Sequence, residues 1–392
     1  MNINSLIILA GSACLTVSAH ADIIDVPGDH PTIEAAVEAA LEGDEIRVGP
    51  GVWYENLFIS KQITITGSGQ GVTIIDGSQP QLYDFGSCLV VTGFNSQTNE
   101  PFRLQSLTLR GGSGAAIYGV IRGGGIYSEF AAVELNAVTI THCSVERQSK
   151  YDSMGWGGAI CNYGGEYVIN DSLLSDNRSF SHGGAIYSYG SIRLTDTLVT
   201  SNTADLTGGG VYTNLSGSDA SFLRTSICGN QSRFGGGVAL ADSGTLRFDA
   251  CRLTGNLAED GAALHMDETA SVIAESSFVR NATLSDDGSV IRIIDQPGAP
   301  GVLSVEVYGS LFCGANQGDW QEFIVETEPN EFLDICAPPG DLDHDGMVTG
   351  SDLSILLSRW GDSGMEAGAD LDCDGVVSGP DLSVLLANWS AS

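Results

Sequence analysis

Basic residues are scarce in this chain of 392 residues: 16 Lys and Arg stand against 49 Asp and Glu, which gives a formal net charge of −33. A surface of that sign repels the phosphate backbone, so a nucleic-acid partner is excluded and cations are favoured as ligands. Charged residues make up only 17% of the chain, whereas glycine, with 51 residues, is about twice as frequent as the usual ~7%. This composition disfavours an ordinary helical enzyme, and 42% hydrophobic residues suffice for a large core.

Long apolar runs are also lacking, except at the beginning of the chain. Residues 1–19 contain no charged side chain and are followed by His20 and Ala21. An apolar run that closes on an Ala-x-Ala pattern is typical of a signal peptide, so residues 1–21 are expected to be removed on export. The alternatives are an uncleaved anchor, for which the run is shorter than the ~20 residues of a spanning helix, and a lipoprotein at Cys14. We expect a secreted or cell-surface protein with no transmembrane segment in the mature chain.

Metal-binding cysteine pairs of the CxxC kind are missing as well. The mature chain keeps eight cysteines, and an exported protein can oxidise them. Cys313 and Cys336 lie 23 residues apart (336 − 313) at the apparent end of the large domain. A disulfide between them and a pair of free thiols are both open at this stage, and the other cysteines are interpreted as buried thiols.

A repeat of small residues followed by an aliphatic one organises the middle of the chain. The aliphatic positions are 34, 26, 25, 27, 26 and 27 residues apart: Ile126, Ile160, Ile186, Val211, Val238, Leu264 and Ile291. A second column consists of Asn177, Asn202, Asn230, Asn256 and Asn281, with Cys143 in the same phase. Alternating runs at 191–195 and 245–248 are typical of half-buried strands. Stacked copies of the repeat would bury its apolar side and align the asparagines as a ladder. We therefore expect residues 52–312 to form roughly ten coils.

These features predict a mostly β protein with a right-handed parallel β-helix domain over residues 22–336. The Gly-Gly-Ala-Ile sequences at 157–160 and 183–186, and the Phe-x-x-Asn sequence at 278–281, resemble the paired repeats of polymorphic outer-membrane proteins. The resemblance covers residues 124–292. It implies a β-helical passenger of the kind that this family uses for surface display and adhesion.

Residues 22–51 are expected to form an N-terminal cap that covers the open first coil. A short helix there would begin after Thr32 and end at Gly43. Its apolar stripe consists of Ile33, Ala36, Val37, Ala40 and Leu41. The segment 26–51 resembles the N-terminal part of pectin-lyase-like β-helix proteins, which implies the same fold.

The end of the chain is strongly acidic. From 319 to 392 there are 16 acidic residues and one basic residue, a net charge of −15. Two copies of a twelve-residue pattern begin 29 residues apart (370 − 341). Carboxylates at positions 1, 3, 5 and 12, a carbonyl at position 7 and a hydroxyl at position 9 supply the oxygens that Ca²⁺ takes, and glycine at position 6 permits the turn. The pattern therefore predicts two calcium loops rather than two polar turns, with the ligands Asp341, Asp343, Asp345, Met347, Thr349, Asp352, Asp370, Asp372, Asp374, Val376, Ser378 and Asp381.

Aspartate in place of glutamate at position 12, with a helix only after each loop, resembles type I dockerin repeats over residues 340–392. The resemblance implies a dockerin-like domain at 337–392 that attaches to a cohesin-like or cell-surface protein. Dockerin contacts at loop positions 10 and 11 correspond here to Gly350, Ser351, Gly379 and Pro380. Trp360 and Trp389 close the two helices at matching places and are expected to be core anchors rather than a recognition pair.

The signatures of catalysis are missing. The adjacent acidic pairs at 259–260 and 286–287 do not suit a hydrolase, because neighbours on a strand face opposite sides. The chain has two lysines, Lys61 and Lys150, so no basic cluster suits a lyase. His182 only loosely resembles the histidine of polygalacturonases and is interpreted as a turn residue. No residue is therefore assigned a catalytic role.

Three tyrosines each follow an inward aliphatic residue, so they are expected to point outward in one column: Tyr127, Tyr187 and Tyr212, with Trp156 and Tyr163 nearby. Such rings either stack on sugars or cover the sheet as a ladder between coils. The sequence thus favours a non-catalytic binding or adhesion component, with polysaccharide as a candidate ligand of the β-helix. An extracellular polysaccharide lyase or glycoside hydrolase and an inert spacer are the alternatives.

Overall fold

The computed structural model describes residues 21–390, with gaps at 80–84, 94–99, 148–151, 215–217, 242–243, 268–269, 285–288, 295–304, 309, 314–323, 327–329, 334–335, 344 and 363–368. The predicted signal peptide up to residue 20, together with Cys14, Lys150 and the acidic pair 286–287, lies outside the described residues. No helix of the described part is long and apolar enough to cross a membrane.

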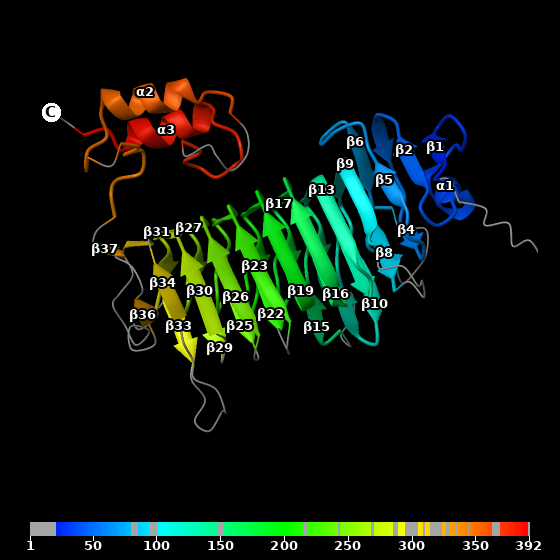
Figure 1. The fold of residues 1–392 in the computed structure, drawn as a ribbon, viewed down its shortest axis with the longest axis horizontal. Coiled ribbons are helices and arrows are strands. Elements are labelled where there is room, and N and C mark those ends of the chain that lie inside the picture. The colour runs from blue at the N-terminus through cyan, green and yellow to red at the C-terminus, as the bar shows by residue number, and fades with distance from the viewer. Residues whose placement is uncertain are drawn as a thin grey trace, which may run out of the picture.

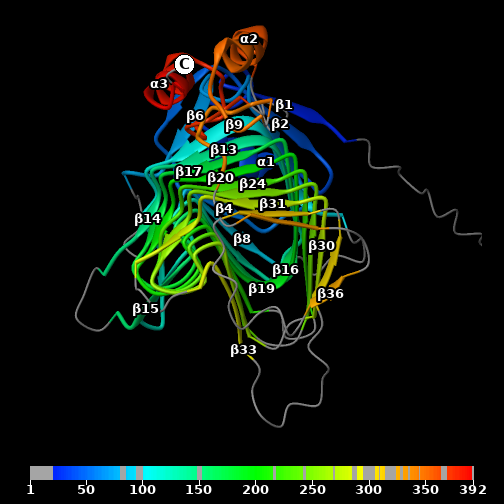
Figure 2. The same ribbon diagram turned by 90° about the vertical axis from the view of Figure 1, so that its left-hand side faces the viewer.

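Residues 23–333 form a parallel β-helix, a rod whose coils run along three faces (Figures 1 and 2). Face one contains β4 (Leu57–Ile59), β8 (Leu89–Thr92), β12 (Ile126–Glu129), the beginnings of β16 (Ile160–Asn170) and β19 (Ile186–Thr195), β22 (Val211–Asn214), β25 (Val238–Ala241), β29 (Leu264–Asp267) and β33 (Ile291–Ile294). Face two contains β1 (Ile23–Val26), β2 (Glu45–Val48), β5 (Thr64–Thr66), the beginnings of β9 (Phe102–Arg110) and β13 (Val133–Thr141), the ends of β16 and β19, β23 (Asp219–Leu223), β26 (Thr245–Asp249), β30 (Ala270–Ala274), β34 (Val305–Tyr308) and β36 (Ile324–Glu326).

Face three contains β3 (Gly51–Trp53), β6 (Thr73–Asp76), the ends of β9 and β13, β17 (Leu173–Ser175), β20 (Leu198–Thr200), β24 (Ser226–Cys228), β27 (Arg252–Thr254), β31 (Ser277–Val279), β35 (Leu311–Cys313) and β37 (Glu331–Leu333). Short outer strands flank the rod: β7 (Phe85–Gly86), β10 (Gly114–Ile117), β11 (Val120–Arg122), β15 (Met154–Trp156), β14 (Ser144–Val145), β18 (Arg178–Ser179), β21 (Thr203–Ala204), β28 (Leu257–Ala258) and β32 (Ala282–Thr283). The stack begins before and ends after the predicted range 52–312.

The predicted aliphatic column lies in register inside the rod. Ile160 pairs with Ile126 on one side and with Ile186 on the other, and the column continues through Val211 to Ile291. All of its members are buried in the main core. The core exists because each strand sends alternate residues inward and the next coil covers them, which confirms the predicted β-helix.

The corner between faces two and three is built from residues in the left-handed backbone region. Asp171, Asp196 and Arg224 have φ values of 49°, 48° and 44°, and Ala250 and Glu275 repeat the conformation at the following coils. A corner made by one such residue bends the chain sharply, so the strands on either side stay in register from coil to coil.

The predicted asparagine ladder forms at the next corner. Asn202 Nδ2 donates to Asn230 Oδ1 at 3.0 Å, and the same contact joins Asn177 to Asn202, Asn230 to Asn256 and Asn256 to Asn281. Each Nδ2 also donates to a backbone carbonyl of the preceding coil, as Asn202 does to Leu174. Because the amides are buried, these bonds satisfy polar groups that would otherwise destabilise the core.

The cap helix is confirmed as α1 (Ile33–Ala39). Thr32 is its N-cap, and Thr32 Oγ1 accepts a hydrogen bond from the Ala35 amide at 3.2 Å. The helix ends earlier than predicted, at the C-cap Ala40, so Leu41 leaves the apolar stripe and is 70% exposed. Residues 22–51 do more than cover the rod, because β1 and β2 in this segment are the first strands of face two.

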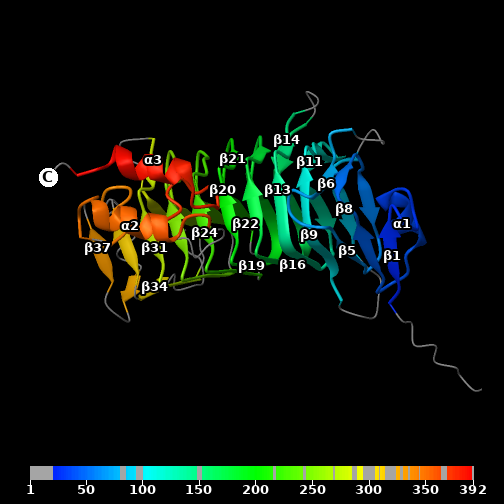
Figure 3. The ribbon, with the colours of Figure 1, turned by 90° about the horizontal axis from the view of Figure 1, so that it is seen from above.

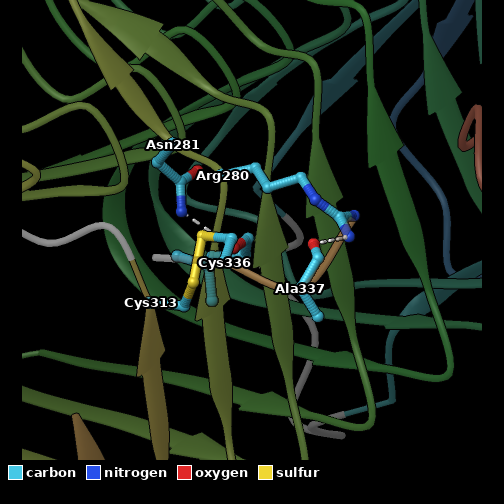
Figure 4. The surroundings of a disulfide bond; sticks show 6 residues. Arg280, Asn281, Cys313, Cys336 and Ala337 are labelled. Carbon is cyan, nitrogen blue, oxygen red and sulfur yellow. Dashed lines mark hydrogen bonds between the residues drawn. A yellow bond between two sulfur atoms is a disulfide. The ribbon is translucent and has the colours of Figure 1, made fainter. Parts of the chain in front are cut away.

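The C-terminal residues form a helix pair, α2 (Gly350–Ser358) and α3 (Gly379–Ala387), which lies across the C-terminal half of the rod (Figures 1 and 3). Its own small core contains Val348, Leu356, Ala369, Val377 and Leu385. Just before this helix pair, Cys336 forms a disulfide with Cys313 of the rod. Beside the disulfide, Arg280 Nη2 donates to the Ala337 carbonyl at 2.7 Å (Figure 4). The disulfide resolves the open question at this pair, and the six other described cysteines are buried free thiols.

Candidate functional site

The two acidic loops bring their carboxylates together. In the first loop, ligand atoms of Asp341, Asp343 and Asp345 lie within 4.8 Å of one another, and in the second loop those of Asp370, Asp372, Asp374 and Asp381 do the same. Side chains of like charge repel one another at such distances, and a cation among them would offset this repulsion. Both clusters could therefore hold a metal ion.

The first and last residues of each loop are buried, whereas the carboxylates at positions 3 and 5 are exposed. Asp341, Asp352, Asp370 and Asp381 are at most 7% exposed. Asp352 Oδ1 accepts from the Leu342 amide at 2.7 Å, and Asp381 Oδ1 accepts from the Leu371 amide at 2.6 Å. The position 12 carboxylate thus ties the end of each loop to its beginning, and in the second loop it also joins the acidic cluster.

Backbone amides arrange the loops further. The glycine amide at position 6 donates to the carboxylate at position 1 in both copies, from Gly346 to Asp341 at 2.9 Å and from Gly375 to Asp370 at 3.0 Å. These glycines have φ values of 89° and 91°, a region that a side chain would strain. The requirement for glycine at position 6 therefore comes from the backbone conformation itself.

The structure places the remaining predicted ligands beside the acidic clusters. The side chains of Met347 and Val376 are 52% and 41% exposed, as suits residues whose proposed ligand is the backbone carbonyl. Thr349 is the N-cap of α2, and Ser378 is the N-cap of α3. Each N-cap amide donates to the position 12 carboxylate, at 2.8 Å for Thr349 and 2.7 Å for Ser378, so the helix N-terminus and the loop are closed by the same aspartate.

The electrostatics of the second loop favour a bound cation. Partial desolvation, followed by the charges of Asp381 and Asp374, raises the pKa of Asp372 to about 6. Burial also raises the pKa of Asp370 above its usual range. In the first loop, the buried Asp341 Oδ1 accepts no hydrogen bond from the described residues. A cation would supply the missing partner of this oxygen and would offset the repulsion in the second loop.

The two tryptophans are not core anchors, so this prediction is wrong. Trp360 is 47% exposed and Trp389 is 43% exposed, because each stands just beyond the end of its helix. Leu357 and Leu386, one turn earlier, are also about half exposed, at 52% and 51%. The C-terminal domain therefore exposes the same pair of a leucine and a tryptophan twice, once in each copy of the 29-residue repeat.

On the rod, the three predicted tyrosines do leave the main core in one column, but they cover one another. Tyr127 is 1% exposed and Tyr187 is 7% exposed, and both belong to a separate outer cluster. Tyr187 stacks on Trp156 with ring centroids 4.7 Å apart and on Tyr212 at 5.3 Å. These contacts favour the ladder between coils over an open platform for sugars.

Arg122 is a buried cation in this outer cluster. Its guanidinium lies 5.6, 5.2 and 5.0 Å from the ring centroids of Tyr127, Trp156 and Tyr163, and the residue is 9% exposed. Among the described residues no carboxylate forms an ion pair with it, and its Nε has no hydrogen-bond partner. Cation–π contacts therefore take the place of an ion pair. The sequence pattern alone did not predict a role for this residue.

Two exposed rings and a half-buried one lie beside the buried column, and we call Phe130, Tyr163 and Tyr189 the outer rings. Phe130 is 67% exposed and Tyr189 is 42% exposed. Tyr163 joins them, with ring centroids 6.0 Å from Phe130 and 5.9 Å from Tyr189. The outer rings extend over neighbouring coils. In the strand register Tyr163 lies opposite Tyr189 on one side and opposite Glu129, the residue before Phe130, on the other.

The described residues that were weighed as catalytic candidates take part in contacts that stabilise the fold. Glu259 pairs with Arg233 at 2.8 Å, and Asp260 accepts from the Gly261 and Ser289 amides at 3.1 and 2.8 Å. Lys61 caps α1 through three carbonyls. His182 is not simply a turn residue, because it pairs with Trp156 and Thr207 in a column of single bridges and its ring contacts Tyr212. Burial lowers the pKa of His182, so its ring stays neutral at pH 7.

Comparisons with known proteins give only distant likenesses. No family model and no curated protein matches the chain. Among solved structures, a mannuronan C-5 epimerase A-module (AlgE4) from Azotobacter vinelandii is similar with a TM-score of 0.43 at 15% identity, over 77% of this chain and 91% of that one. A pectin methylesterase from carrot gives 0.34 at 13% identity, over 72% and 90%. At these TM-scores the likenesses carry no inference about activity.

Proposed function

We propose that the protein is a secreted or cell-surface β-helix component without catalytic activity, whose domain at 337–392 binds two Ca²⁺ ions and attaches the rod to a partner. The observation that carries this proposal is the pair of acidic clusters, built from matching residues 29 apart and closed by the same backbone hydrogen bonds. Oxygen ligands in this number and spacing suit Ca²⁺ better than a metal that prefers nitrogen or sulfur. The likeness to type I dockerins agrees with this assignment.

The attachment surface that we propose consists of the exposed residues at the helix ends and starts. Leu357 and Trp360 on one repeat, and Leu386 and Trp389 on the other, offer apolar contact area that the module's own core does not use. Loop positions 10 and 11 are exposed in both repeats, as a dockerin-like interface requires: Gly350, Ser351, Gly379 and Pro380. Aromatic anchors of this kind dominate many protein interfaces. The partner is a cohesin-like or cell-surface protein with a complementary apolar patch.

The attachment is tested by binding the full chain to an immobilised type I cohesin module, with calcium and with a chelator. We expect binding in calcium only, and loss of that binding when Trp360 and Trp389 are both changed to Ala. Tyr118→Ala is the matched control, because Tyr118 is an aromatic residue that is 100% exposed but lies on the rod. Calcium uptake without binding to the cohesin would contradict the cohesin-like partner while leaving the calcium sites intact.

A second function, binding of a polysaccharide on the rod, is supported by the outer rings. Exposed rings spaced along neighbouring coils can stack on successive sugars of a chain. The guanidinium of Arg122 lies 5.0 Å from the ring centroid of Tyr163, one of the outer rings, and this positive charge favours a polymer that carries carboxylates. The competing proposal, a polysaccharide lyase or glycoside hydrolase, predicts steady formation of unsaturated or reducing ends from polygalacturonate or alginate. The non-catalytic proposal predicts none.

A further inference from the structure

The C-terminal domain covers an apolar spot on face three of the rod. Leu173, Leu198 and Cys228 each lie next to an inward residue on their strand, so their side chains point away from the main core. They form a separate cluster with one residue of the second acidic loop, Cys373. Cys228 is 1% exposed and Cys373 is 8% exposed, so the contact excludes water from both thiols.

Cys373 has an unusual backbone conformation for its residue type. It occupies position 4 of the second loop, between Asp372 and Asp374, with φ at 61°. Glycine, asparagine or aspartate tolerates this region more easily than cysteine does. The loop therefore holds its cysteine in a strained conformation, with the side chain directed at the rod rather than at the acidic cluster.

Further contacts fix the loop at this spot. Arg252 on β27 donates from Nη1 to the Asp370 carbonyl at 3.2 Å, and the Leu198 side chain lies close to Gly375. At the start of the domain, Arg280 holds the Ala337 carbonyl. With the loop held in this way, Cys228 and Cys373 pack in one small cluster that is closed off from solvent.

We propose that Cys228 and Cys373 form a disulfide that joins the C-terminal domain to the rod. The chain already contains one disulfide, Cys313–Cys336, so it matures where thiols are oxidised. The oxidant is a disulfide, either of a thiol oxidoreductase or of oxidised glutathione. One thiolate attacks it and releases one thiol. The second thiolate then displaces the other thiol and closes the bond, so that two cysteines lose two hydrogens and one disulfide becomes two thiols.

This bond would convert a docked domain into a fixed one. The two cysteines are 145 residues apart (373 − 228), and they would link a coil in the middle of the rod to a loop near the end of the chain. A link over so long a stretch strongly restricts the opened state, so undocking of the domain becomes rare. The orientation of the exposed pairs Leu357 with Trp360 and Leu386 with Trp389 relative to the rod would then be constant. This inference is independent of calcium and of the partner.

The test is a peptide map of the full chain after it has been reduced, unfolded and refolded with reduced and oxidised glutathione, because the docked thiols are closed off from solvent. The unfolded protein is alkylated without reductant and cut with trypsin, which releases residues 225–233 with Cys228 as the sole cysteine and residues 360–392 with Cys373 as the sole cysteine. We expect these two peptides as one species that is lighter than their sum by two hydrogen atoms. The peptide 293–359 contains both Cys313 and Cys336 and serves as the internal control for oxidation.

Recovery of 225–233 and 360–392 as separate, alkylated or glutathionylated peptides, with the internal disulfide of 293–359 intact, would overturn the proposal. A second measurement uses hydrogen exchange of residues 370–377 in Cys228→Ala, compared with Cys161→Ala, which removes a buried thiol from face one. We expect faster exchange in Cys228→Ala after oxidation, and the difference should vanish when both variants are kept reduced. Equal exchange of the two oxidised variants would also contradict the disulfide.

Discussion

The carboxylate of Asp381 accepts a hydrogen bond from the backbone amide of Asp372 at 3.1 Å, while the side chains of the same two residues belong to one acidic cluster. The hydrogen bond holds the loop in a shape that keeps like charges close together. The backbone of the loop therefore sets the positions of the proposed ligands. The same bond, from Asp343 to Asp352 at 3.2 Å, occurs in the first loop.

Calcium affinity of the second loop should fall below pH 6. Asp372 has its pKa raised from 3.8 to about 6 in the folded protein, so in the calcium-free protein this carboxyl stabilises the fold below about pH 4 and loses that contribution as the pH rises through 6. Calcium binds the ionised form and therefore releases a proton in this range. We expect affinity to decrease by up to about tenfold per pH unit below 6 in calcium titrations.

Asp372→Asn is the matched variant for this prediction. It keeps the size of the side chain but removes its titration, so the second site should become weaker and lose most of its pH dependence between pH 5 and pH 7. An affinity of the wild-type second loop that stays constant over this range would show that Asp372 is not a ligand or does not titrate there.

Removal of one rung of the asparagine ladder should destabilise the rod. Asn230→Ala leaves buried groups of Asn202 and Asn256 without partners, so we expect a loss of about 3 kcal/mol in the free energy of unfolding of the coils around it. Asn136→Ala is the control, because its bond to Asn170 at 2.9 Å is only partly buried. It should cost less than about 1 kcal/mol. Native-state hydrogen exchange along the coils measures both, and equal losses would contradict the role of the buried ladder.

The cap helix should depend on Lys61. Its Nζ donates to the carbonyls of Val37, Glu38 and Ala40 at 2.8, 2.8 and 2.7 Å, which closes the C-terminal end of α1. Lys61→Met should therefore loosen α1, at a cost of roughly 2 kcal/mol. We expect faster hydrogen exchange in α1 of Lys61→Met. The control Arg47→Met should leave the exchange of α1 unchanged. Unchanged exchange in α1 would mean that the packing of Ile33, rather than this cap, holds the helix.

Binding of an acidic polysaccharide should depend on the outer rings. Tyr189→Ala removes a ring that is 42% exposed and leaves the buried pair of Trp156 and Tyr187 in place. We expect about tenfold weaker retention in gels that contain polygalacturonate or alginate, which corresponds to the ~1.4 kcal/mol of one stacking contact. Tyr118→Ala, an exposed ring elsewhere on the rod, should leave retention unchanged. Equal retention of both variants would remove the outer rings from the binding surface.

The parts of the fold that the sequence predicts are those that repeat. Ile160 and Asn202 can be assigned an inward position because their counterparts recur every coil and a stack is the arrangement that buries them all. The glycines of the acidic loops are predictable for a similar reason, since each copy supports the other. Cys313 and Cys336 left two options open, because spacing alone does not bring two thiols together.

The features that the sequence does not predict depend on contacts that are not repeated from coil to coil. Trp360 was expected in a core, but the small core of the C-terminal domain is already filled by residues such as Leu356 and Leu385. Arg122 was missed because its ring partners come from other coils. A signal was present nonetheless: Arg122, Trp156 and His182 each stand directly before a glycine pair, and the same column contains them in the structure.

Calorimetric titration of the calcium-free full chain with CaCl₂ counts the calcium sites. We expect two sites in the wild type, one site each in Asp341→Ala and in Asp370→Ala, and none when both changes are combined. Glu331→Ala, which removes an exposed carboxylate outside both loops, should keep two sites. Heat signals that are the same in the wild type and in the double variant, or no calcium binding at all, would contradict the two proposed calcium sites.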